Sequence, residues 1–260
     1  MENNNVYIHP DAKIGKNVTL EPFTSIAGDV VIEDGSWIGP NATIMDGARI
    51  GKNCKIFPGA VISAIPQDLK FQGEITTAEI GDNSIIRECV TVNRGTKSKN
   101  KTIIGQNTML MAYSHIAHDC IIGNNIIIGN ACQIAGEVEI DDWAILSGLV
   151  AVHQFVRIGK HVIISGGSLV RKDVPPYIKA AHEPLAYAGV NSIGLRRRNF
   201  SNEKINDILE MYRELYLRGN NNSQAIENIK SKMSASEERE EIINFFQQSE
   251  RGIIKGVNSQ

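Results

Sequence analysis

An aliphatic residue occupies every sixth position over most of the chain. The series runs without failure over residues 8–62, resumes over 80–92 and continues over 104–170. A second column of small or β-branched residues lies two positions before each aliphatic, and glycine often follows the aliphatic. A period of six matches neither the ~3.6-residue helical period nor simple strand alternation. The pattern predicts short parallel strands joined by corners, with both columns pointing inward and stacking coil upon coil. Glycine would relieve tight or left-handed positions at those corners.

This hexapeptide pattern is similar to that of the left-handed parallel β-helix family, in which three hexapeptides make one triangular turn. The left hand is implied by the resemblance, and it departs from the right-handed crossovers of most parallel sheets. The frame is lost over residues 63–79 and 93–103, which predicts two loop excursions with a function of their own. We therefore expect a mainly β protein, with a left-handed parallel β-helix over residues 1–184.

The six-residue frame ends near residue 175, and the pattern then becomes helical. Ser201 is expected to cap a helix whose apolar residues recur three and four positions apart. A second helix is expected to begin at Ser223, and Ser234 with Glu237 has the spacing of a capping box before a third. These signals predict a small α-helical C-terminal domain over residues 185–260.

Composition narrows the class of protein further. A formal net charge of -2 over 260 residues gives no sign of the clustered positive charge that binds nucleic acid, so we expect no such partner. The polar start MENNNVYIHP lacks the apolar core of a signal peptide. No apolar run reaches the ~20 residues that a membrane helix needs. The sequence therefore predicts a cytoplasmic protein without a membrane span.

The four cysteines form no CxxC pair and indicate neither a disulfide framework nor a zinc site. Cys54, Cys120 and Cys132 fall in the small inward column and are expected to be buried. Cys89 lies one position outside that column, and the sequence assigns it no role.

The stretch HIAHDC, residues 115–120, places two of the six histidines beside an aspartate. Ile116 belongs to the inward column, so His115 must point out of the prism. His118 and Asp119 follow at its outer edge or corner. The frame excludes the prism interior for these side chains. They must therefore face solvent, a neighbouring subunit, or a site between the two.

Stacking of successive coils adds neighbours to His118. One turn is 18 residues, so Gly136 and then Gln154, with His153 beside it, should follow His118 along the outer wall, with coils about 4.8 Å apart. Acyl transfer needs a base that takes a hydroxyl proton and a donor that faces the developing oxyanion. This strip supplies both, although most polar strips on β-helices are only solvated.

Five motifs occur in order along the chain: PQDLKF, HIAHDC, AVHQF, DVPPY and GLRRRNFS. With them, the whole chain resembles the UDP-N-acetylglucosamine O-acyltransferase family that begins lipid A synthesis. The resemblance implies a homotrimer with active sites between adjacent prisms. It also implies transfer of a 3-hydroxyacyl group to the sugar 3-hydroxyl. The acyl group would arrive on the phosphopantetheine of acyl carrier protein, with no other cofactor and no metal.

The resemblance also implies roles for residues at matching positions. His118 matches the general base, Asp119 would orient or polarise its imidazole, and Gly136 matches the glycine whose backbone N–H binds the oxyanion. Asp68, in the first excursion, matches a carboxylate that holds the sugar. The other matches are positions near the sugar, the diphosphate or the pantetheine (Lys70, His115, His153 and Gln154) and basic residues near the nucleotide phosphates or the carrier (Arg197 and Arg198).

The chain departs from the family pattern at two positions. Asn93 stands where many members carry histidine, and Glu137 follows Gly136 where many read Ala-Gly-His. Glu137 would add negative charge beside an oxyanion site unless it points away or meets a cation. One hypothesis is an altered choice between the 3-hydroxy sugar and its 3-amino analogue.

Three alternatives share the fold. The related N-acyltransferase acts on a glucosamine amine, but it usually carries an extra N-terminal domain, whereas this repeat begins by residue 8. A γ-type carbonic anhydrase would hold zinc with histidines such as His115, His118 and His153, but would leave the PQDLK loop and the helical tail without a role. A non-catalytic scaffold would need neither the excursions nor the polar strip.

Overall fold

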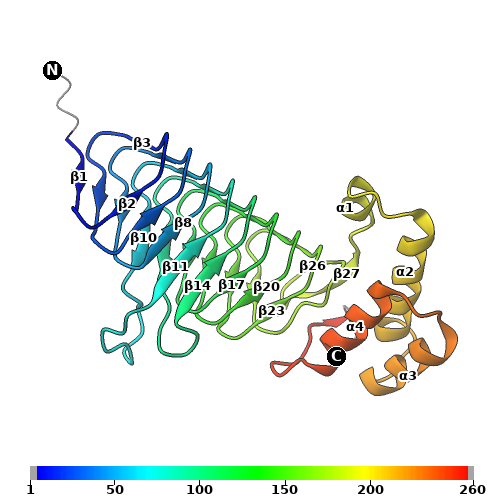
Figure 1. Cartoon of the computed structure of the whole chain (residues 1–260). Coiled ribbons are helices and arrows are strands. Elements are labelled where there is room, and N and C mark those ends of the chain that lie inside the picture. Colours follow the sequence, from blue (N-terminus) through cyan, green and yellow to red (C-terminus); the bar gives the residue numbers. More distant parts are fainter. Residues whose placement is uncertain (1–4, 257–260) are drawn as a thin grey trace.

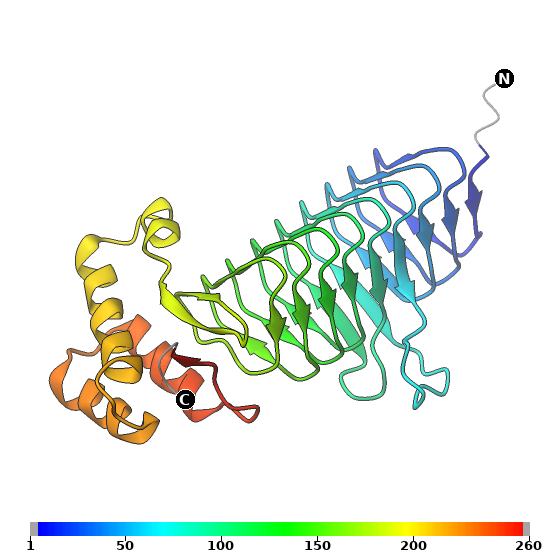
Figure 2. The same ribbon diagram turned by 180° about the vertical axis from the view of Figure 1, so that it is seen from behind.

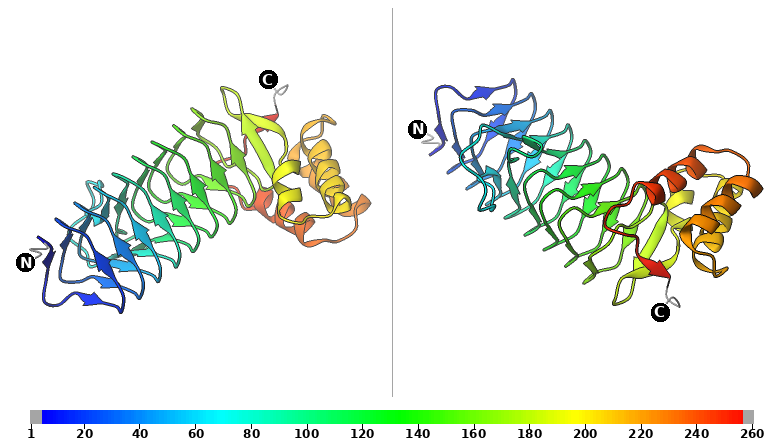
Figure 3. Two further views of the ribbon diagram at one scale, coloured as in Figure 1. Left: turned by 90° about the horizontal axis from the view of Figure 1, so that it is seen from above. Right: turned by 90° about the horizontal axis from the view of Figure 1, so that it is seen from below.

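The computed structural model describes residues 5–256 and shows a straight triangular prism followed by a group of helices (Figure 1). Most strands are two residues long, and each turn of the chain lays one strand on each of three walls. Figure 3 shows that the coils stack regularly along the whole prism. The stacked parallel strands are those that the six-residue repeat predicts, and the fold is the left-handed parallel β-helix that the resemblance implies.

Each wall is a sheet whose prism strands are all parallel, and within residues 5–256 the walls have nine, eight and eleven strands. Wall A contains β1 (Tyr7–Ile8), β4 (Ser25–Ile26), β7 (Thr43–Ile44), β10 (Val61–Ala64), β13 (Thr91–Asn93), β16 (His115–Ile116), β19 (Gln133–Ile134), β22 (Ala151–Val152) and β25 (Leu169–Val170). Wall B contains β2 (Lys13–Ile14), β5 (Val31–Ile32), β8 (Ala48–Ile50), β11 (Thr77–Ile80), β14 (Lys101–Ile104), β17 (Ile121–Ile122), β20 (Glu139–Ile140) and β23 (Arg157–Ile158). Wall C contains β3 (Thr19–Leu20), β6 (Trp37–Ile38), β9 (Lys55–Ile56), β12 (Ile85–Ile86), β15 (Met109–Leu110), β18 (Ile127–Ile128), β21 (Ile145–Leu146), β24 (Ile163–Ile164), β26 (Ile178–Ala181), β27 (Ala186–Val190) and β28 (Lys255–Gly256).

The two columns that the repeat predicts to point inward fill the prism. From Ile26 to Val170 every aliphatic of the six-residue series is at most 3% exposed, and burying one such side chain contributes about 1.5–3 kcal/mol. Cys54, Cys120 and Cys132 are buried as predicted. Burial raises the pKa of the Cys120 thiol to about 12, so this thiol stays protonated and acts as a small core group.

The corners between walls need a left-handed residue, and it comes three positions after the inward aliphatic. Asparagine holds many of these positions, for example Asn53 and Asn107 with φ of 53° and 54°, because its short polar side chain tolerates this region. The glycines directly after the aliphatics relieve close contact instead. A Cβ on Gly105 would lie 2.5 Å from the carbonyl oxygen of Gly123. The expectation of tight positions is therefore confirmed, while the left-handed positions fall elsewhere.

Two excursions leave the prism at the same edge, between walls A and B (Figures 1 and 2). Residues 65–76 join β10 to β11, and residues 94–100 join β13 to β14, so both are shorter than the frame breaks in the sequence. They contact each other, since the Thr76 hydroxyl donates to the Gly95 carbonyl at 2.6 Å. The two excursions lie side by side because they interrupt successive coils of the prism.

The excursions preserve the phase of the repeat. Ile62 and Ile80 are 18 residues apart and Val92 and Ile104 are 12 apart, where the regular step is six. Both segments therefore return to wall B with the same side chains pointing inward.

Beyond β25 the chain extends wall C. β26 pairs in parallel with β24 and antiparallel with β27, and β28 returns from the end of the chain to pair with β27. The β26–β27 pair lies across residue 184, where the sequence places a domain boundary. That division into two domains stays a prediction.

The helices of residues 5–256 are α1 (Ser192–Arg197), α2 (Asn202–Tyr216), α3 (Asn222–Lys232) and α4 (Glu237–Gln247). Ser201 caps α2, as predicted. The start of α3 lies slightly earlier than predicted, because Asn221 is its N-cap and forms a capping box with Gln224. The capping box predicted at Ser234 is wrong, since Ser236 caps α4 by accepting from the Arg239 N–H. None of these helices is long and apolar enough to span a membrane.

The helices are joined to the end of the prism by buried aromatic contacts. The Tyr212 hydroxyl donates to the Pro176 carbonyl at 2.5 Å, and the Tyr187 and Tyr216 rings stack with centroids 4.7 Å apart. These contacts hold α2 against the extended part of wall C.

Replacing Gly105 with alanine should lower the thermal unfolding midpoint by several degrees. The new methyl group would lie 2.5–2.6 Å from Gly123 backbone atoms, and overpacking of this kind costs about 1–3 kcal/mol. Gly148→Ala is the matched control, because its nearest contact would be 3.3 Å away. Scanning calorimetry of both variants checks this, and equal midpoints would contradict the argument.

Candidate active site

Polar residues meet at the edge of wall A, just after β16, β19 and β22. Ile116 pairs with Ile134, which in turn pairs with Val152. The residues two positions later, His118, Gly136 and Gln154, therefore stack as the sequence predicts. They line a pocket of about 710 Å³ together with Asp68 and Lys70 of the first excursion and with His115.

His118 points away from the prism interior, yet it is only 8% exposed. The first excursion covers it, and Asp68 Oδ2 lies 3.9 Å from His118 Nε2. On its other side, a Cβ at Gly136 would lie 2.6 Å from His118 Cε1 and Nε2. The imidazole therefore packs against the Gly136 backbone, and any side chain at residue 136 would displace it.

The Gly136 backbone N–H is a free donor in this pocket. Among residues 5–256 no acceptor is hydrogen-bonded to it, whereas the neighbouring Glu137 N–H donates to the His118 carbonyl at 3.0 Å. A buried donor without a partner lies ready for a ligand oxygen.

Asp119 lies at the corner after His118, with a left-handed φ of 60° and no exposed surface. Its Oδ2 is 2.8 Å from His118 Nδ1. Burial alone raises the pKa of Asp119, but hydrogen bonds from Thr96, His118 and Lys99 outweigh it, so the pKa lies below its ordinary value. Because the ionised carboxylate only accepts, the proton of this contact lies on Nδ1, which leaves Nε2 of the neutral ring as an acceptor.

Asp68 and Lys70 are placed by a turn in the first excursion. The Lys70 N–H donates to Asp68 Oδ1 at 2.9 Å and the Phe71 N–H donates to the Asp68 carbonyl at 3.0 Å. This turn fixes the carboxylate above His118. Leu69, between Asp68 and Lys70 in the sequence, is fully exposed.

His115 lies one strand position before the inward Ile116 and contacts the Thr91 hydroxyl through Nδ1 at 2.7 Å. Burial lowers the pKa of His115 below its ordinary value, so the ring is neutral at neutral pH. His115 therefore offers the pocket an uncharged polar group.

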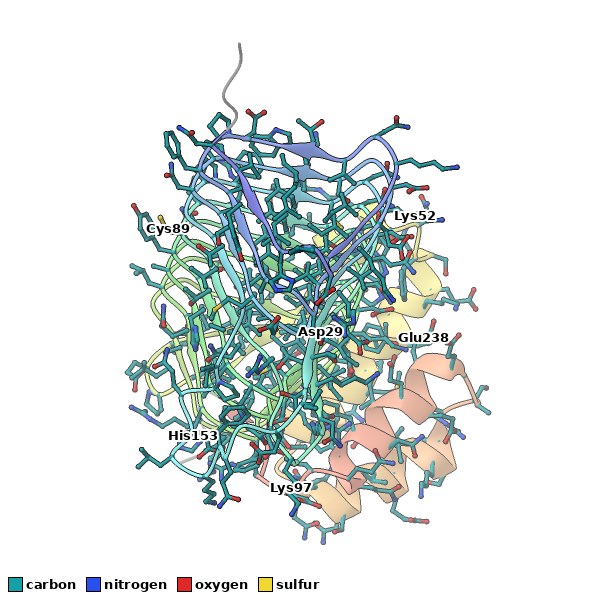
Figure 4. The ribbon with its side chains drawn as sticks, turned by 60° about the vertical axis from the view of Figure 1, so that its left-hand side comes forward. Asp29, Lys52, Cys89, Lys97, His153 and Glu238 are labelled. Carbon is teal, nitrogen blue, oxygen red and sulfur yellow. The ribbon has the colours of Figure 1, made fainter. Side chains whose placement is uncertain are left out.

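His153 lies beside Gln154 but does not line the pocket. Its Nδ1 lies 2.9 Å from Arg251 Nη2, a residue near the end of the chain, and 3.1 Å from the Gln154 carbonyl. Figure 4 shows His153 at the same side of the prism as Lys97 of the second excursion.

Arg197 and Arg198 are not near His118 within one chain. They lie at the end of α1 and line a separate pocket of about 460 Å³ against wall C. Arg198 Nη1 lies 3.2 Å from His161 Nδ1, and its guanidinium lies 5.0 Å from the centroid of the Trp143 ring. In a single chain this arginine is thus anchored to the corner residues of the prism.

The two departures from the family pattern lie outside the His118 pocket. Asn93 is 2% exposed and its amide donates to the Ile65 carbonyl at 3.3 Å, where the first excursion begins. Glu137 lines a different pocket of about 730 Å³, together with Lys99 and Arg157. Neither residue therefore supports an altered sugar preference within one chain.

Sequence reasoning missed the contribution of the second excursion. Three backbone or side-chain donors of Thr96 and Lys99 make hydrogen bonds of 2.6–3.1 Å to Asp119. The break in the six-residue frame was the available signal, because it showed where the chain leaves the wall, but not which atoms it reaches.

Within residues 5–256, no group of three or more His, Cys, Asp or Glu side chains is arranged to hold a metal ion. His115 and His118 therefore meet no third ligand in this part of the chain.

Comparison with protein-family models identifies the class of protein to which this chain belongs. The bacterial transferase hexapeptide model matches residues 29–64 and 101–136, and the model of UDP N-acetylglucosamine O-acyltransferase domain 2 matches residues 173–254. Together with the prism and the His118 pocket, these matches define a hexapeptide-repeat transferase.

Individual relatives define the family. The acyl-[acyl-carrier-protein]–UDP-N-acetylglucosamine O-acyltransferase of Thiobacillus denitrificans is 42% identical over 191 residues, which are 73% of this chain and 74% of that protein. The crystal structure of a UDP-N-acetylglucosamine acyltransferase from Bacteroides fragilis is 54% identical, covers 98% of this chain and 100% of its own, and has a TM-score of 0.95. The Francisella novicida acyltransferase is 40% identical over 98% of this chain and 94% of its own, with a TM-score of 0.95. The chain belongs to the UDP-N-acetylglucosamine O-acyltransferase family.

The buried ring of His161 should make folding stability depend on pH. Burial, and then the charges of Arg198 and Lys160, lower the pKa of His161 from 6.5 to about 4. The unfolded chain therefore binds this proton at a higher pH than the folded chain does. Above pH 6.5 the buried neutral ring does not lower the free energy of unfolding. As the pH falls toward 4, protonation of the unfolded chain lowers that free energy by up to about 3 kcal/mol.

His161→Phe should flatten this dependence, because phenylalanine cannot titrate and already holds the equivalent corner at Phe23 and Phe155, where φ is 64° and 66°. Denaturant unfolding of both proteins between pH 4 and 6.5 measures the two slopes. Identical slopes would remove His161 as their cause.

Proposed function

We propose that this protein transfers a 3-hydroxyacyl group from acyl carrier protein to the 3-hydroxyl of UDP-N-acetylglucosamine, the first step of lipid A biosynthesis. The arrangement of three groups in one pocket carries the proposal. In the neutral ring His118 Nε2 is an acceptor, Asp119 holds its Nδ1, and the Gly136 N–H has no hydrogen-bond partner among residues 5–256. Membership of the family supports the choice of substrates.

In the proposed reaction, His118 Nε2 takes the proton of the sugar 3-hydroxyl as its oxygen attacks the thioester carbonyl carbon. The carbonyl oxygen becomes an oxyanion, which the Gly136 N–H stabilises. When the intermediate collapses, the C–S bond breaks and the pantetheine sulfur leaves, taking the proton back from His118. Asp119 stabilises the imidazolium that exists between these two transfers.

The remaining site residues would bind the substrates. Asp68 is placed to accept hydrogen bonds from sugar hydroxyls, and Lys70, His115 and Gln154 line the same pocket. The acyl group arrives on the phosphopantetheine of its carrier, so the proposed reaction needs no cofactor or metal of the protein's own. Acyl carrier protein and the nucleotide sugar would be met in the cytoplasm.

The proposal includes a homotrimer, and an unpartnered apolar surface supports it. The outward residues of wall C are half-buried aliphatic side chains in five successive coils: Ile85, Met109, Ile127, Ile145 and Ile163. At the edge between walls C and A, Tyr113 and Leu149 are 66% and 68% exposed, and Cys89 projects from the same edge (Figure 4). A surface of this kind is typical of a subunit interface.

A trimer would also explain the position of Arg197 and Arg198. Their pocket contacts Ile145 and Ile163 of wall C, whereas His118 lies at the edge of wall A. If wall C of one subunit packs against wall A of the next, these arginines approach the partner's pocket. His153 and Gln154 would then meet substrate from the opposite side.

A product assay tests the proposed reaction directly. Purified protein is mixed with UDP-N-acetylglucosamine and with acyl carrier proteins that bear 3-hydroxyacyl groups of several lengths. The mass of the sugar nucleotide is then measured by mass spectrometry. A product heavier by one hydroxyacyl group is expected with at least one length. The absence of product with every length would refute the proposed function.

His118→Ala should reduce turnover by about 10²–10⁴-fold while the protein remains folded, because the variant lacks the base. His182→Ala is the control, since His182 is exposed and outside the pocket. Steady-state kinetics and circular dichroism measure the two effects. Near-normal turnover of His118→Ala would show that another group takes the proton.

Ile127→Asp should break the proposed trimer, because it places a carboxylate in the middle of the wall C aliphatic surface. Ile121→Asp is the matched control on wall B, where Ile121 is already 38% exposed. Light scattering should give a smaller mass and low activity for the first variant and an unchanged mass for the second. A stable trimer of Ile127→Asp would place the interface elsewhere.

A further inference from the structure

The second excursion folds over the corner that carries Asp119. The Thr96 N–H lies 2.9 Å from Oδ1 and 3.1 Å from Oδ2, and the Lys99 N–H donates to Oδ1 at 3.0 Å. The Thr96 hydroxyl donates to Oδ2 at 2.6 Å. Three donors of the second excursion therefore converge on one buried carboxylate.

The Thr96 hydroxyl and the His118 ring share one acceptor atom. Both contact Asp119 Oδ2, at 2.6 Å and 2.8 Å. The direction in which this oxygen presents its lone pairs decides whether Nδ1–H can point at it. A change at Thr96 therefore reaches the imidazole without any direct contact with it.

The corner itself does not require these bonds. The equivalent corners between walls A and B carry Gly47, Glu137 and Phe155. Each of these residues has a left-handed φ without side-chain hydrogen bonds like those to Asp119. The excursion is held independently, because the Lys99 ammonium pairs with Glu139 at 2.9 Å. The contacts to Asp119 thus have a purpose beyond closing the corner.

We propose that Thr96 is a positioning residue for the reaction: its hydroxyl fixes Asp119 so that His118 keeps its proton on Nδ1 and presents a bare Nε2 to the substrate. The inference rests on the proposed function. Thr96 touches neither substrate nor the reacting atoms, and it acts through Asp119 alone.

Other charged and titratable groups face the pair and would be unchanged by substitution of Thr96. Asp68 lies above His118 Nε2, His115 precedes it on wall A, and Lys99 lies beside Asp119. Without the hydroxyl, the carboxylate binds a proton more readily. The pKa of Asp119 should then rise toward its ordinary value, because one of the hydrogen bonds that lower it is lost.

Thr96→Val removes the hydroxyl and keeps the shape of the side chain, whereas Thr96→Ser keeps the hydroxyl. We expect Thr96→Val to lower kcat about tenfold, as the loss of a charge-assisted hydrogen bond would. KM for both substrates should stay within about twofold. The acid limb of the kcat/KM profile should move to higher pH, and Thr96→Ser should restore both values.

A spectroscopic measurement keeps the test independent of substrate. Nitrogen-15 spectra of the histidine rings, with His118→Gln to assign the signal, should show the Nδ1–H form in the wild type. Thr96→Val should show a mixture of tautomers. Thr96→Ala serves in the same way if the valine variant does not fold, as judged by its unfolding midpoint.

The outcomes separate the two proposals. A wild type that makes no product but shows the expected tautomer shift would refute the proposed reaction and leave the Thr96–Asp119–His118 linkage standing. Active wild type with an unchanged kcat, acid limb and tautomer in Thr96→Val would overturn the inference. Equal losses in the valine and serine variants, with a lower unfolding midpoint, would assign Thr96 a structural role only and would also overturn it.

Discussion

The register between successive coils is the constraint on which the rest of this molecule depends. Parallel ladders pair each inward aliphatic with the one a turn away, as Ile116 pairs with Ile134. A slip of one residue would turn the whole aliphatic column toward water. Since the register is fixed so strongly, the outward positions are fixed with it, and groups such as His118 and Gly136 meet although neither contributes to the core.

The candidate site combines three levels of this architecture. Wall A places the imidazole, the corner after it places Asp119, and the second excursion supplies the donors that keep that carboxylate ionised despite burial. The opposing effects of burial and hydrogen bonding are both needed. A solvated carboxylate would hold the ring loosely, and a buried one without donors would take up a proton and lose its charge.

Much of this arrangement could be predicted from the sequence, because a strict period assigns every residue a direction. The buried cysteines, the outward His118 and its neighbours Gly136 and Gln154 all follow from counting in sixes. Counting fails where the repeat fails. The contacts of Thr96 depend on the path of a non-repeating loop, and the cap at Ser236 competed with an equally suitable serine two residues earlier. Arg197 follows the prism, where the repeat no longer assigns directions, so counting could not show that it lies in a different pocket from His118.

The length of the excursions has a consequence for how such a protein can change. Both insertions are whole multiples of the repeat, and both begin and end on the same two walls. A segment of this kind could be shortened or replaced by whole repeats, since the coils above and below it would stay in phase. The prism can thus be inherited unchanged while the loops that surround its reactive edge diversify. Changes of loop length by whole repeats would leave the inward aliphatic columns in register.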